Sequence, residues 1–367
     1  MSRLRGPLLI GLLALLAACA SSAPAQESSL RLPPGFQVEV FATGLGAPRF
    51  LAVSPSGDLF ASVPSRGQVL ALPDRNGDGK ADAVIVAAEE LSRPHGLAFL
   101  PGWLYVAETG AVIRVPHQAG DLRGGKREVV VPDLPSGGGH WTRTVVFGPD
   151  AKMYVSVGSS CNACEERDQR RAAILQFNAD GSEGRIFARG IRNAVGMAFR
   201  PQTRELWATN NGRDRLGDDF PPDTLLLVKD GAHYGWPYCN GRQVPDPDLG
   251  RPQFCKTTEP PAVEIQAHSA PLGLAFYTGT MFPAEYRGDL FVALHGSWNR
   301  SAPAGYKLIR VPLAGGRPGA PQDFATGWLQ TGRAWGRPVD VVTGKDGALY
   351  LSDDRAGVIY RISYARG

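Results

Sequence analysis

Short apolar segments recur along the chain from residue 47 onward. Each copy has an apolar strand, a turn with Pro, Gly or Asp, and a second strand, as in "APRFLAVSPSGDLFASV" and "RPHGLAFLPGWLYVAET". Aligned on one apolar position, the copies fall at Leu51, Leu97, Val145, Met197, Leu274 and Val341. The steps between them are 46, 48, 52, 77 and 67 residues. The pattern therefore indicates six repeats.

Several copies continue into a third strand, for example "AVIRVP" and "GVIYRIS", and no segment has the apolar periodicity of a long amphipathic helix. Strands that repeat at this spacing are typical of a β-propeller. We predict an all-β fold, a six-bladed β-propeller, as a single domain over residues 31–366. The opening strand "FQVEVFA" is expected to pair with the last blade and close the ring. Insertions after Asn210 and Tyr238 are expected to form loops on one face.

The N-terminus predicts export. Two arginines precede an apolar run over residues 8–18, which is too short to span a bilayer and ends at small residues, as in a secretory signal. The tetrapeptide "LAAC" resembles a bacterial lipobox. We therefore predict a signal peptide over 1–18, lipidation of Cys19, a flexible tether over 19–30, and a location on the periplasmic side of the membrane, held by the lipid anchor only. An ordinary secreted protein is the alternative.

Composition and charge narrow the class of protein. The chain is 43% hydrophobic and holds 45 glycines and 30 prolines, which fits a loop-rich globular protein with a large core. Its formal net charge of +4 includes the two arginines of the predicted signal peptide. No Lys/Arg run or basic patch interleaved with aromatic residues is present, which argues against a nucleic-acid partner.

Four cysteines follow the lipobox: Cys161, Cys164, Cys239 and Cys255. In an oxidising compartment they predict two disulfides, most simply between the first two and between the last two, although three pairings are possible. The "CNAC" motif lacks the histidine of a c-type haem site, and no βαβ pattern surrounds it to suggest thioredoxin-like chemistry. We interpret it as a structural loop staple.

Polar residues gather just before the first strands of the repeats, where a propeller chain passes its central channel. They are Arg49, His95, His140, Arg192, Asn193, His268 and Arg337. Each histidine alone could be a hydrogen-bonded residue of the channel wall. Their recurrence at equivalent positions predicts a shared polar site.

Two motifs carry a family resemblance. Arg192-Asn193 precedes the fourth repeat's first strand, and "GAHYGWP", residues 231–237, follows that repeat. Together with "GGGHWTRTVVFGPDAKMYVSVG", they resemble the quinoprotein glucose/sorbosone dehydrogenase family, closest to its sorbosone-dehydrogenase-like branch. The resemblance covers essentially the whole mature chain. Members of this family are six-bladed propellers that bind pyrroloquinoline quinone (PQQ) with Ca²⁺.

The resemblance implies catalytic roles. His140 would be the general base that takes the proton of the sugar's anomeric hydroxyl while hydride passes to the quinone, since an imidazole titrates near neutral pH. Asp219 would orient this histidine. Arg192 and Asn193 would hydrogen-bond the quinone and stabilise negative charge on its oxygen.

The resemblance also implies groups that bind the cofactor and its metal. Arg337 and, as a weaker candidate, Arg300 would pair with quinone carboxylates. The backbone carbonyls of Gly212 and Arg213 would bind Ca²⁺, as hard oxygen ligands do. The sequence departs from the family pattern at Arg213, where the family has proline, at Ser159, where many members have aspartate, and at Val339, where a second arginine is often found. These departures suggest a different substrate, weaker cofactor binding or a catalytically silent relative.

A separate motif, "DRNGDGKAD", has the spacing of a calcium loop. The candidate oxygen ligands are Asp74, Asn76, Asp78, Lys80 and Asp82, with the Lys80 ligand a carbonyl. Ile85 stands where the bidentate glutamate is expected. A structural Ca²⁺ site and a plain hairpin turn are both open.

Taken together, the sequence predicts a quinoprotein that oxidises an aldose or a sugar-derived aldehyde such as sorbosone and passes electrons to an external acceptor. One alternative is a non-catalytic propeller that binds a protein or a carbohydrate. Another is a metal-dependent, lactonase-like hydrolase, which requires carboxylates and asparagines converging on a metal. Arginine and histidine dominate the candidate positions, which argues against the hydrolase.

Overall fold

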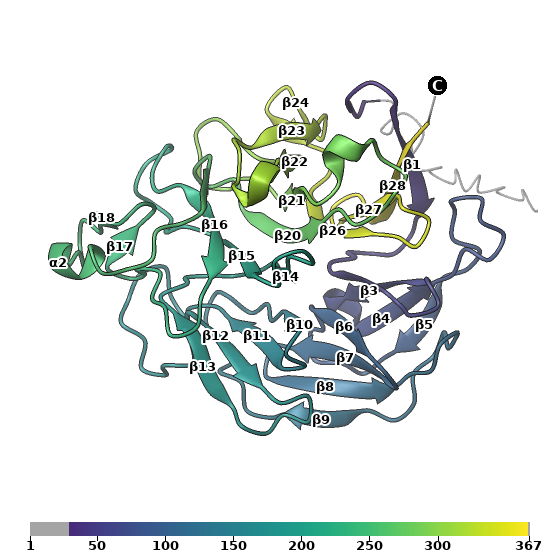
Figure 1. Cartoon of the computed structure of the whole chain (residues 1–367), viewed down its shortest axis with the longest axis horizontal. Helices are drawn as coiled ribbons and strands as arrows, with labels where there is room; N and C mark the ends of the chain where they lie inside the picture. The colour runs from purple at the N-terminus through teal and green to yellow at the C-terminus, as the bar shows by residue number, and fades with distance from the viewer. Residues whose placement is uncertain (1–28, 366–367) are drawn as a thin grey trace, which may run out of the picture.

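The computed structural model describes residues 29–365, whose regular secondary structure is almost entirely β-strand (Figure 1). Six four-stranded antiparallel sheets are arranged as blades around a central axis, so the prediction of a six-bladed β-propeller is confirmed. The predicted signal peptide, Cys19 and all but the last two residues of the predicted tether lie outside the described residues. Within the described part, no helix has the length and apolar character needed to cross a membrane.

The blades follow one another along the chain, each running outward from its first strand. Blades one to three are β2 (Leu51–Val53), β3 (Leu59–Val63), β4 (Gln68–Leu72) and β5 (Ile85–Ala88); β6 (Leu97–Leu100), β7 (Trp103–Glu108), β8 (Ala111–Pro116) and β9 (Glu128–Val131); and β10 (Val145–Phe147), β11 (Met153–Val157), β12 (Ala173–Phe177) and β13 (Arg185–Arg189).

The second half of the ring repeats this arrangement. Blades four to six are β14 (Met197–Phe199), β15 (Leu206–Asn210), β16 (Asp223–Val228) and β19 (Val263–Ile265); β20 (Pro271–Phe276), β21 (Leu290–Leu294), β22 (Lys307–Val311) and β23 (Gln322–Ala325); and β26 (Pro338–Thr343), β27 (Leu349–Asp353), β28 (Val358–Tyr364) and β1 (Phe36–Ala42). The short elements outside the blades are η1 (Pro64–Arg66), β17 (Cys239–Asn240), β18 (Val244–Pro245), α2 (Pro252–Cys255), η2 (Ala284–Tyr286), η3 (Ala314–Gly316), β24 (Leu329–Gln330) and β25 (Arg333–Ala334).

The positions used to align the repeats all lie on the first, innermost strands: β2, β6, β10, β14, β20 and β26. The predicted third strands are also present. The fourth strands of blades one to five were not predicted. They are short and partly exposed, as β9 and β13 are.

The first strand of the chain closes the ring, as predicted. β1 pairs antiparallel with β28, placing Val38 opposite Ile362, and so becomes the outer strand of blade six. Phe36 at its start makes edge contacts with aromatic rings of blade five and the last strand; the nearest are Phe282, Phe324 and Tyr364 at 4.7–4.9 Å between centroids. β1 and β28 thus pair with each other, and β1 is also packed against a neighbouring blade.

The core is distributed around the ring. In the described residues, six clusters of buried apolar side chains each join two neighbouring blades. A seventh, smaller cluster contains Phe50, Val195, Leu272 and Val339, which lie at the beginning of the first strands or just before them. These residues come from four of the six blades and lie beside the central axis, and we call this cluster the channel plug.

Both insertions contribute to one end of the propeller. Residues 211–222 join β15 to β16 at the end where Asn210 lies. The insertion between β16 and β19 carries β17, β18 and α2 and returns to the same end, since its Asp246 pairs with Arg213 and its Trp236 donates to the Asn162 carbonyl. The prediction that both insertions form loops on one face is confirmed for these parts of them.

The predicted cysteine pairing is confirmed. Cys161 bonds to Cys164 in the loop after β11, and Cys239 bonds to Cys255 in the insertion of blade four.

The "DRNGDGKAD" segment forms a turn between β4 and β5. Asp74 accepts hydrogen bonds from the amides of Gly77 and Gly79, and Asp78 accepts one from the amide of Lys80. The carboxylates of this segment do not gather into a group of three close ligand atoms within residues 29–365. The segment is a turn held by its own aspartates, and whether this turn binds a structural Ca²⁺ ion through Asp74, Asn76, Asp78, Lys80 and Asp82 stays a prediction.

Phe36→Ala tests the ring closure. The ring is only partly buried, so we expect a loss of about 2 kcal/mol in the free energy of unfolding, below the roughly 3–5 kcal/mol of a fully buried phenylalanine. Denaturant unfolding followed by tryptophan fluorescence measures it. Gln37→Ala, an exposed neighbour in the same strand, is the control and should change stability by less than about 0.5 kcal/mol. Equal effects of the two substitutions would contradict the assigned role of Phe36.

Candidate active site

A polar cavity of about 210 Å³ opens at the end of the channel where the predicted residues gather. Its lining residues are Arg49, His140, Arg192, Asn193, Asn211, Gly212, Asp214, Asp223, His268, Ala270, Leu272, His295, Gly296, Trp298, Asn299 and Arg337. The channel plug forms its floor through Leu272. Val339 is fully buried in that plug, which explains why this position carries no charge.

A tight glycine loop carries His140 to the cavity. Gly137 and Gly138 have φ angles of 86° and 78°, in the left-handed region. A Cβ atom on Gly138 would also lie 2.5 Å from the Ser160 carbonyl oxygen. Arg143, buried below the loop, donates from Nη1 to the His140 carbonyl at 3.0 Å. The glycines let the chain turn sharply, and the arginine holds the turn.

The tautomer of His140 follows from its partners. Its Nδ1 lies 3.0 Å from the Ser159 carbonyl and 2.9 Å from Ser159 Oγ. The Ser159 hydroxyl gives its hydrogen to the Cys161 carbonyl at 2.6 Å, so it acts as an acceptor toward the histidine. Nδ1 must therefore carry the proton, and Nε2 keeps a lone pair. Nε2 has no hydrogen-bond partner among the described residues.

His140 is held neutral. Burial, together with the positive charges of Arg192, Arg143 and Arg171, lowers the pKa of His140 to about 3. Because the ring binds a second proton only below that pH, its Nε2 is an unprotonated acceptor throughout the neutral range.

Arg192 and Asn193 lie beside this histidine. Arg192 is only 4% exposed, donates from Nη2 to Asp214 at 2.8 Å, and is also bound by the Asn162 carbonyl and amide oxygens. The Oδ1 atom of Asn193 is buried without a partner. A Cβ atom on Gly158 would lie 2.6 Å from His140 Cβ and 2.7 Å from Asn193 Oδ1, so glycine is what allows these two side chains to meet.

The structure corrects the expected roles of Asp219 and Arg300. Asp219 has an 89% exposed side chain and pairs with Arg300 at 3.1 Å; it does not contact His140, whose Nδ1 is bonded to Ser159. Arg300 also donates to the Asp218 carbonyl and does not line the cavity. Their ion pair, together with the bond from Arg300 to the Asp218 carbonyl, links the insertion loop to the loop after β21.

Arg337 lies in the cavity as expected. Its Nε donates to the His295 carbonyl at 3.3 Å, and it forms no ion pair within residues 29–365. Neighbouring Arg49 is instead paired with Asp354 at 2.7 Å. Asp354 also accepts from His295 Nε2 at 2.9 Å; burial opposes its ionisation, but the hydrogen bond and charges of His295 and Arg49 lower the pKa of Asp354 to about 2.

The other histidines are bonded within the wall. His268 Nε2 donates to the Gly217 carbonyl at 2.9 Å, and His95 Nδ1 donates to the Arg143 carbonyl at 3.2 Å. Burial lowers the pKa of His295 to about 4, so it is neutral at pH 7 and donates from Nε2. Each of the three histidines that line the cavity thus has one ring nitrogen bonded to the protein; in His140 that nitrogen is Nδ1, whereas in His268 and His295 it is Nε2.

Of the two proposed metal ligands, Gly212 lines the cavity and Arg213 follows it in the chain. Gly212 donates its amide to buried Asp223 at 2.8 Å. The side chain of Arg213 is turned away from the cavity toward Asp246 and Asp248. Neither the Gly212 nor the Arg213 carbonyl accepts a hydrogen bond from residues 29–365.

Sequence reasoning missed several polar residues of the site. They are Asn162, Asn211, Asp214, Asp223, His295, Asn299 and Asp354. They come from loops after second strands or from the ends of outer strands, and no spacing in the sequence connects them to His140.

The fold and cavity define a class: a six-bladed propeller whose channel mouth holds arginines and a neutral histidine. Residues 104–361 match the glucose/sorbosone dehydrogenase family. The chain is also 30% identical over 356 residues to an uncharacterized protein of Borreliella burgdorferi, with 92% of each chain covered. The chain therefore belongs to the glucose/sorbosone dehydrogenase family.

Other relatives are named for their activities. The pyrroloquinoline quinone-dependent pyranose dehydrogenase of Coprinopsis cinerea is 26% identical over 419 residues, which cover 94% of this chain but only 56% of that enzyme. The holo PQQ domain of this fungal enzyme has a TM-score of 0.77 at 23% identity, covering 91% of this chain and 97% of that chain. The PQQ-bound aldose sugar dehydrogenase of Streptomyces coelicolor has a TM-score of 0.67 at 23% identity, covering 91% and 100%. These structural likenesses establish a shared fold.

Arg192→Met tests the electrostatics of the site. In the ligand-free wild type we expect the His140 ring to titrate with a pKa of about 3, measured by NMR of histidine-labelled protein. Removing the guanidinium deletes a positive charge, which makes protonation easier and raises this pKa.

Arg185→Met is the control, because Arg185 pairs with Asp230 on the surface. It should leave the His140 titration unchanged. A wild-type pKa near 6.5, or the same pKa in the Arg192→Met protein, would contradict the assignment.

Proposed function

We propose that this protein is a quinoprotein dehydrogenase that oxidises an aldose or a sugar-derived aldehyde such as sorbosone, with His140 as general base. One observation carries the proposal: the unpaired, unprotonated His140 Nε2 lies in a cavity that also holds three arginines. The named relatives and their PQQ-bound structures support the same class of reaction.

The polar groups of the cavity fit an anionic quinone. Arg337 has no acidic partner in the described residues, and Asn193 Oδ1, Asn299 Oδ1 and Arg49 Nε are buried without hydrogen bonds. A ligand with carboxylate and carbonyl oxygens satisfies the donors among these groups, because arginine pairs with carboxylates through two parallel bonds. The unpartnered carbonyls of Gly212 and Arg213 suit a hard cation such as Ca²⁺.

The cofactor and the side chains of the cavity have separate roles in this reaction. The quinone, when bound, supplies the two-electron acceptor that takes hydride from the sugar carbon. His140 Nε2 accepts the proton of the hydroxyl on that carbon, while the Nδ1–H bond to Ser159 keeps the ring oriented. Arg192, fixed by Asp214 and Asn162, places positive charge where negative charge develops. Arg337 binds a carboxylate of the cofactor.

The low pKa of His140 belongs to the ligand-free site. An anionic ligand beside Arg192 offsets part of the positive charge and raises the pKa of His140, which strengthens the base when the site is loaded. At the cavity rim, Trp298 is 68% exposed and offers an apolar face to a sugar ring. Electrons then pass to an external acceptor.

The hydrolase alternative requires carboxylates that converge on a metal. Here Asp214 pairs with Arg192 and accepts from Asn299, and Asp223 accepts from two backbone amides. Both are thus engaged by the protein, which favours the dehydrogenase.

We also propose that the chain is exported and held at the membrane by a lipid on Cys19. The Cys19→Ala protein should then lose incorporation of labelled fatty acid and leave the membrane fraction. Retention of both in the variant would overturn the anchor.

Reconstitution tests the proposed function. Purified protein is loaded with PQQ and Ca²⁺, and dye reduction is followed with a panel of aldoses and aldehydes. We expect turnover with at least one of them. His140→Ala should lower kcat by roughly 10²–10⁴-fold while still binding the quinone, because the base acts only in the chemical step.

The matched control is His268→Ala, which removes a histidine of the same cavity whose Nε2 is bonded to the protein. It should retain far more activity than His140→Ala. Full activity of His140→Ala would reject the base, and no spectral sign of quinone binding to the wild type would reject the dehydrogenase.

A further inference from the structure

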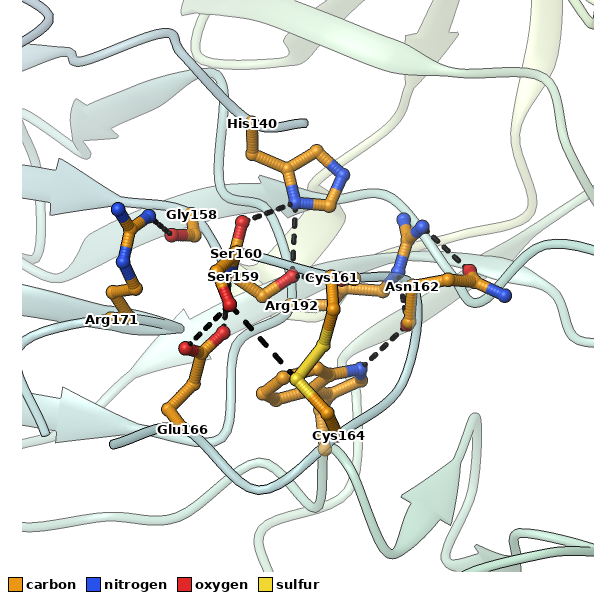
Figure 2. The surroundings of a disulfide bond; sticks show 11 residues. His140, Gly158, Ser159, Ser160, Cys161, Asn162, Cys164, Glu166, Arg171 and Arg192 are labelled. Atoms are coloured by element: carbon orange, nitrogen blue, oxygen red, sulfur yellow. Dashed lines mark hydrogen bonds between the residues drawn. A yellow bond between two sulfur atoms is a disulfide. The ribbon is translucent and has the colours of Figure 1, made fainter. Parts of the chain in front are cut away.

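We propose that the Cys161–Cys164 disulfide loop positions the base and the cofactor-binding arginine together, so that the oxidation state of this disulfide controls the site. The inference rests on the proposed function, because it concerns how His140 and Arg192 are held. Figure 2 shows the loop lying beneath both side chains.

The first connection runs to His140. Ser159 Oγ donates to the Cys161 carbonyl at 2.6 Å and thereby turns a lone pair to His140 Nδ1 at 2.9 Å (Figure 2). The disulfide fixes the position of Cys161, and Cys161 fixes the rotation of the serine hydroxyl. Without that acceptor the hydroxyl is free to donate to Nδ1, in competition with the bond from Nδ1–H to the Ser159 carbonyl, so part of the ring population would carry its proton on Nε2, where it blocks the base.

The second connection runs to Arg192. Asn162, inside the disulfide loop, accepts from Arg192 Nε through its carbonyl at 2.9 Å and from Nη2 through its side-chain oxygen at 2.8 Å. The same side-chain oxygen accepts the Asp214 amide at 2.8 Å. One residue thus holds both the guanidinium and its counter-ion. Since Cys161 and Asn162 are adjacent, one short loop fixes both functional groups.

The two disulfides differ in exposure and span. Cys161 and Cys164 are partly exposed and three residues apart, whereas Cys239 and Cys255 are 6% and 1% exposed and 16 residues apart. A short loop restricts the unfolded chain less than a long one, so the 161–164 bond contributes less to global stability. Because the 161–164 bond lies under the two side chains, we expect it to hold the local structure of the site. Its exposure makes it the bond that a reductant reaches first.

The redox step is thiol–disulfide exchange with a dithiol reductant. A thiolate of the reductant attacks one sulfur, the Cys161–Cys164 bond breaks, and the second thiol of the reductant resolves the mixed disulfide. The protein gains two electrons and two protons as two thiols, and the reductant becomes a cyclic disulfide. Dithiothreitol serves as this reductant in the test.

The experiment compares the Cys161→Ser/Cys164→Ser protein with the Cys239→Ser/Cys255→Ser protein as matched control. Two quantities are measured: the His140 tautomer, by nitrogen-15 NMR without cofactor, and the dissociation constant of PQQ, by absorbance titration with Ca²⁺ and no sugar. In the wild type and the control we expect the Nδ1–H tautomer and the same affinity. In the 161/164 variant we expect a mixture of tautomers and at least tenfold weaker quinone binding.

Reduction of the folded wild-type protein tests the same proposal if a variant fails to fold. Dithiothreitol should reproduce the 161/164 phenotype with an unchanged far-UV circular dichroism spectrum, and reoxidation should restore the wild-type values. An unchanged tautomer and affinity after reduction of this bond would overturn the proposal. If the wild type binds no quinone, the proposed function fails, and the tautomer measurement alone still decides the role of the loop.

Discussion

The pairing of β1 with β28 closes the ring, and the geometry of the cavity depends on that closure. Once six blades are packed face to face by apolar clusters, the segments that precede their first strands must meet around one axis. Apolar residues from four of these segments form the channel plug, and Arg49, Asn193 and Arg337, one or two residues before three of them, line the cavity. The site is thus a consequence of blade order: residues as far apart as Arg49 and Arg337 become neighbours because both open a blade.

Burial of charge shapes the chemistry of this cavity. Arg49 and Arg192 are paired with Asp354 and Asp214, which makes their burial tolerable, whereas Arg337 keeps its charge available for a ligand. The same positive field keeps His140 neutral. An anionic cofactor and a neutral base are therefore compatible in this cavity. The cofactor would supply the negative charge that Arg337 does not receive from a protein carboxylate in the described residues.

Much of this arrangement could be predicted from the sequence, and the remainder has physical reasons. The six repeats, the ring closure and the two disulfides follow from spacing, apolar pattern and cysteine count. The placement of His140, Arg192 and Asn193 at one cavity followed from their position before first strands. The pairing of Asp219 with Arg300 could not be foreseen, because it depends on the path of an insertion loop.

The contacts that hold the site residues in place could not be predicted from the sequence either. Ser159 was noted only as a departure from the family pattern, yet its carbonyl and its hydroxyl, which donates to the Cys161 carbonyl, fix the histidine tautomer. Asn162 had no signal in the sequence, because its task depends on loops that meet only in the folded ring. The outer strands were not predicted because they are partly exposed and their apolar and polar residues alternate only weakly.

Equilibrium titration of the purified protein with PQQ, in the presence of Ca²⁺ and without sugar, tests the nature of this cavity most directly. We expect saturable binding of one quinone per chain, and its loss in a protein carrying both Arg192→Met and Arg337→Met. Binding that does not saturate, or that is unaffected by removal of both arginines, would contradict the assignment of the channel mouth as the quinone site.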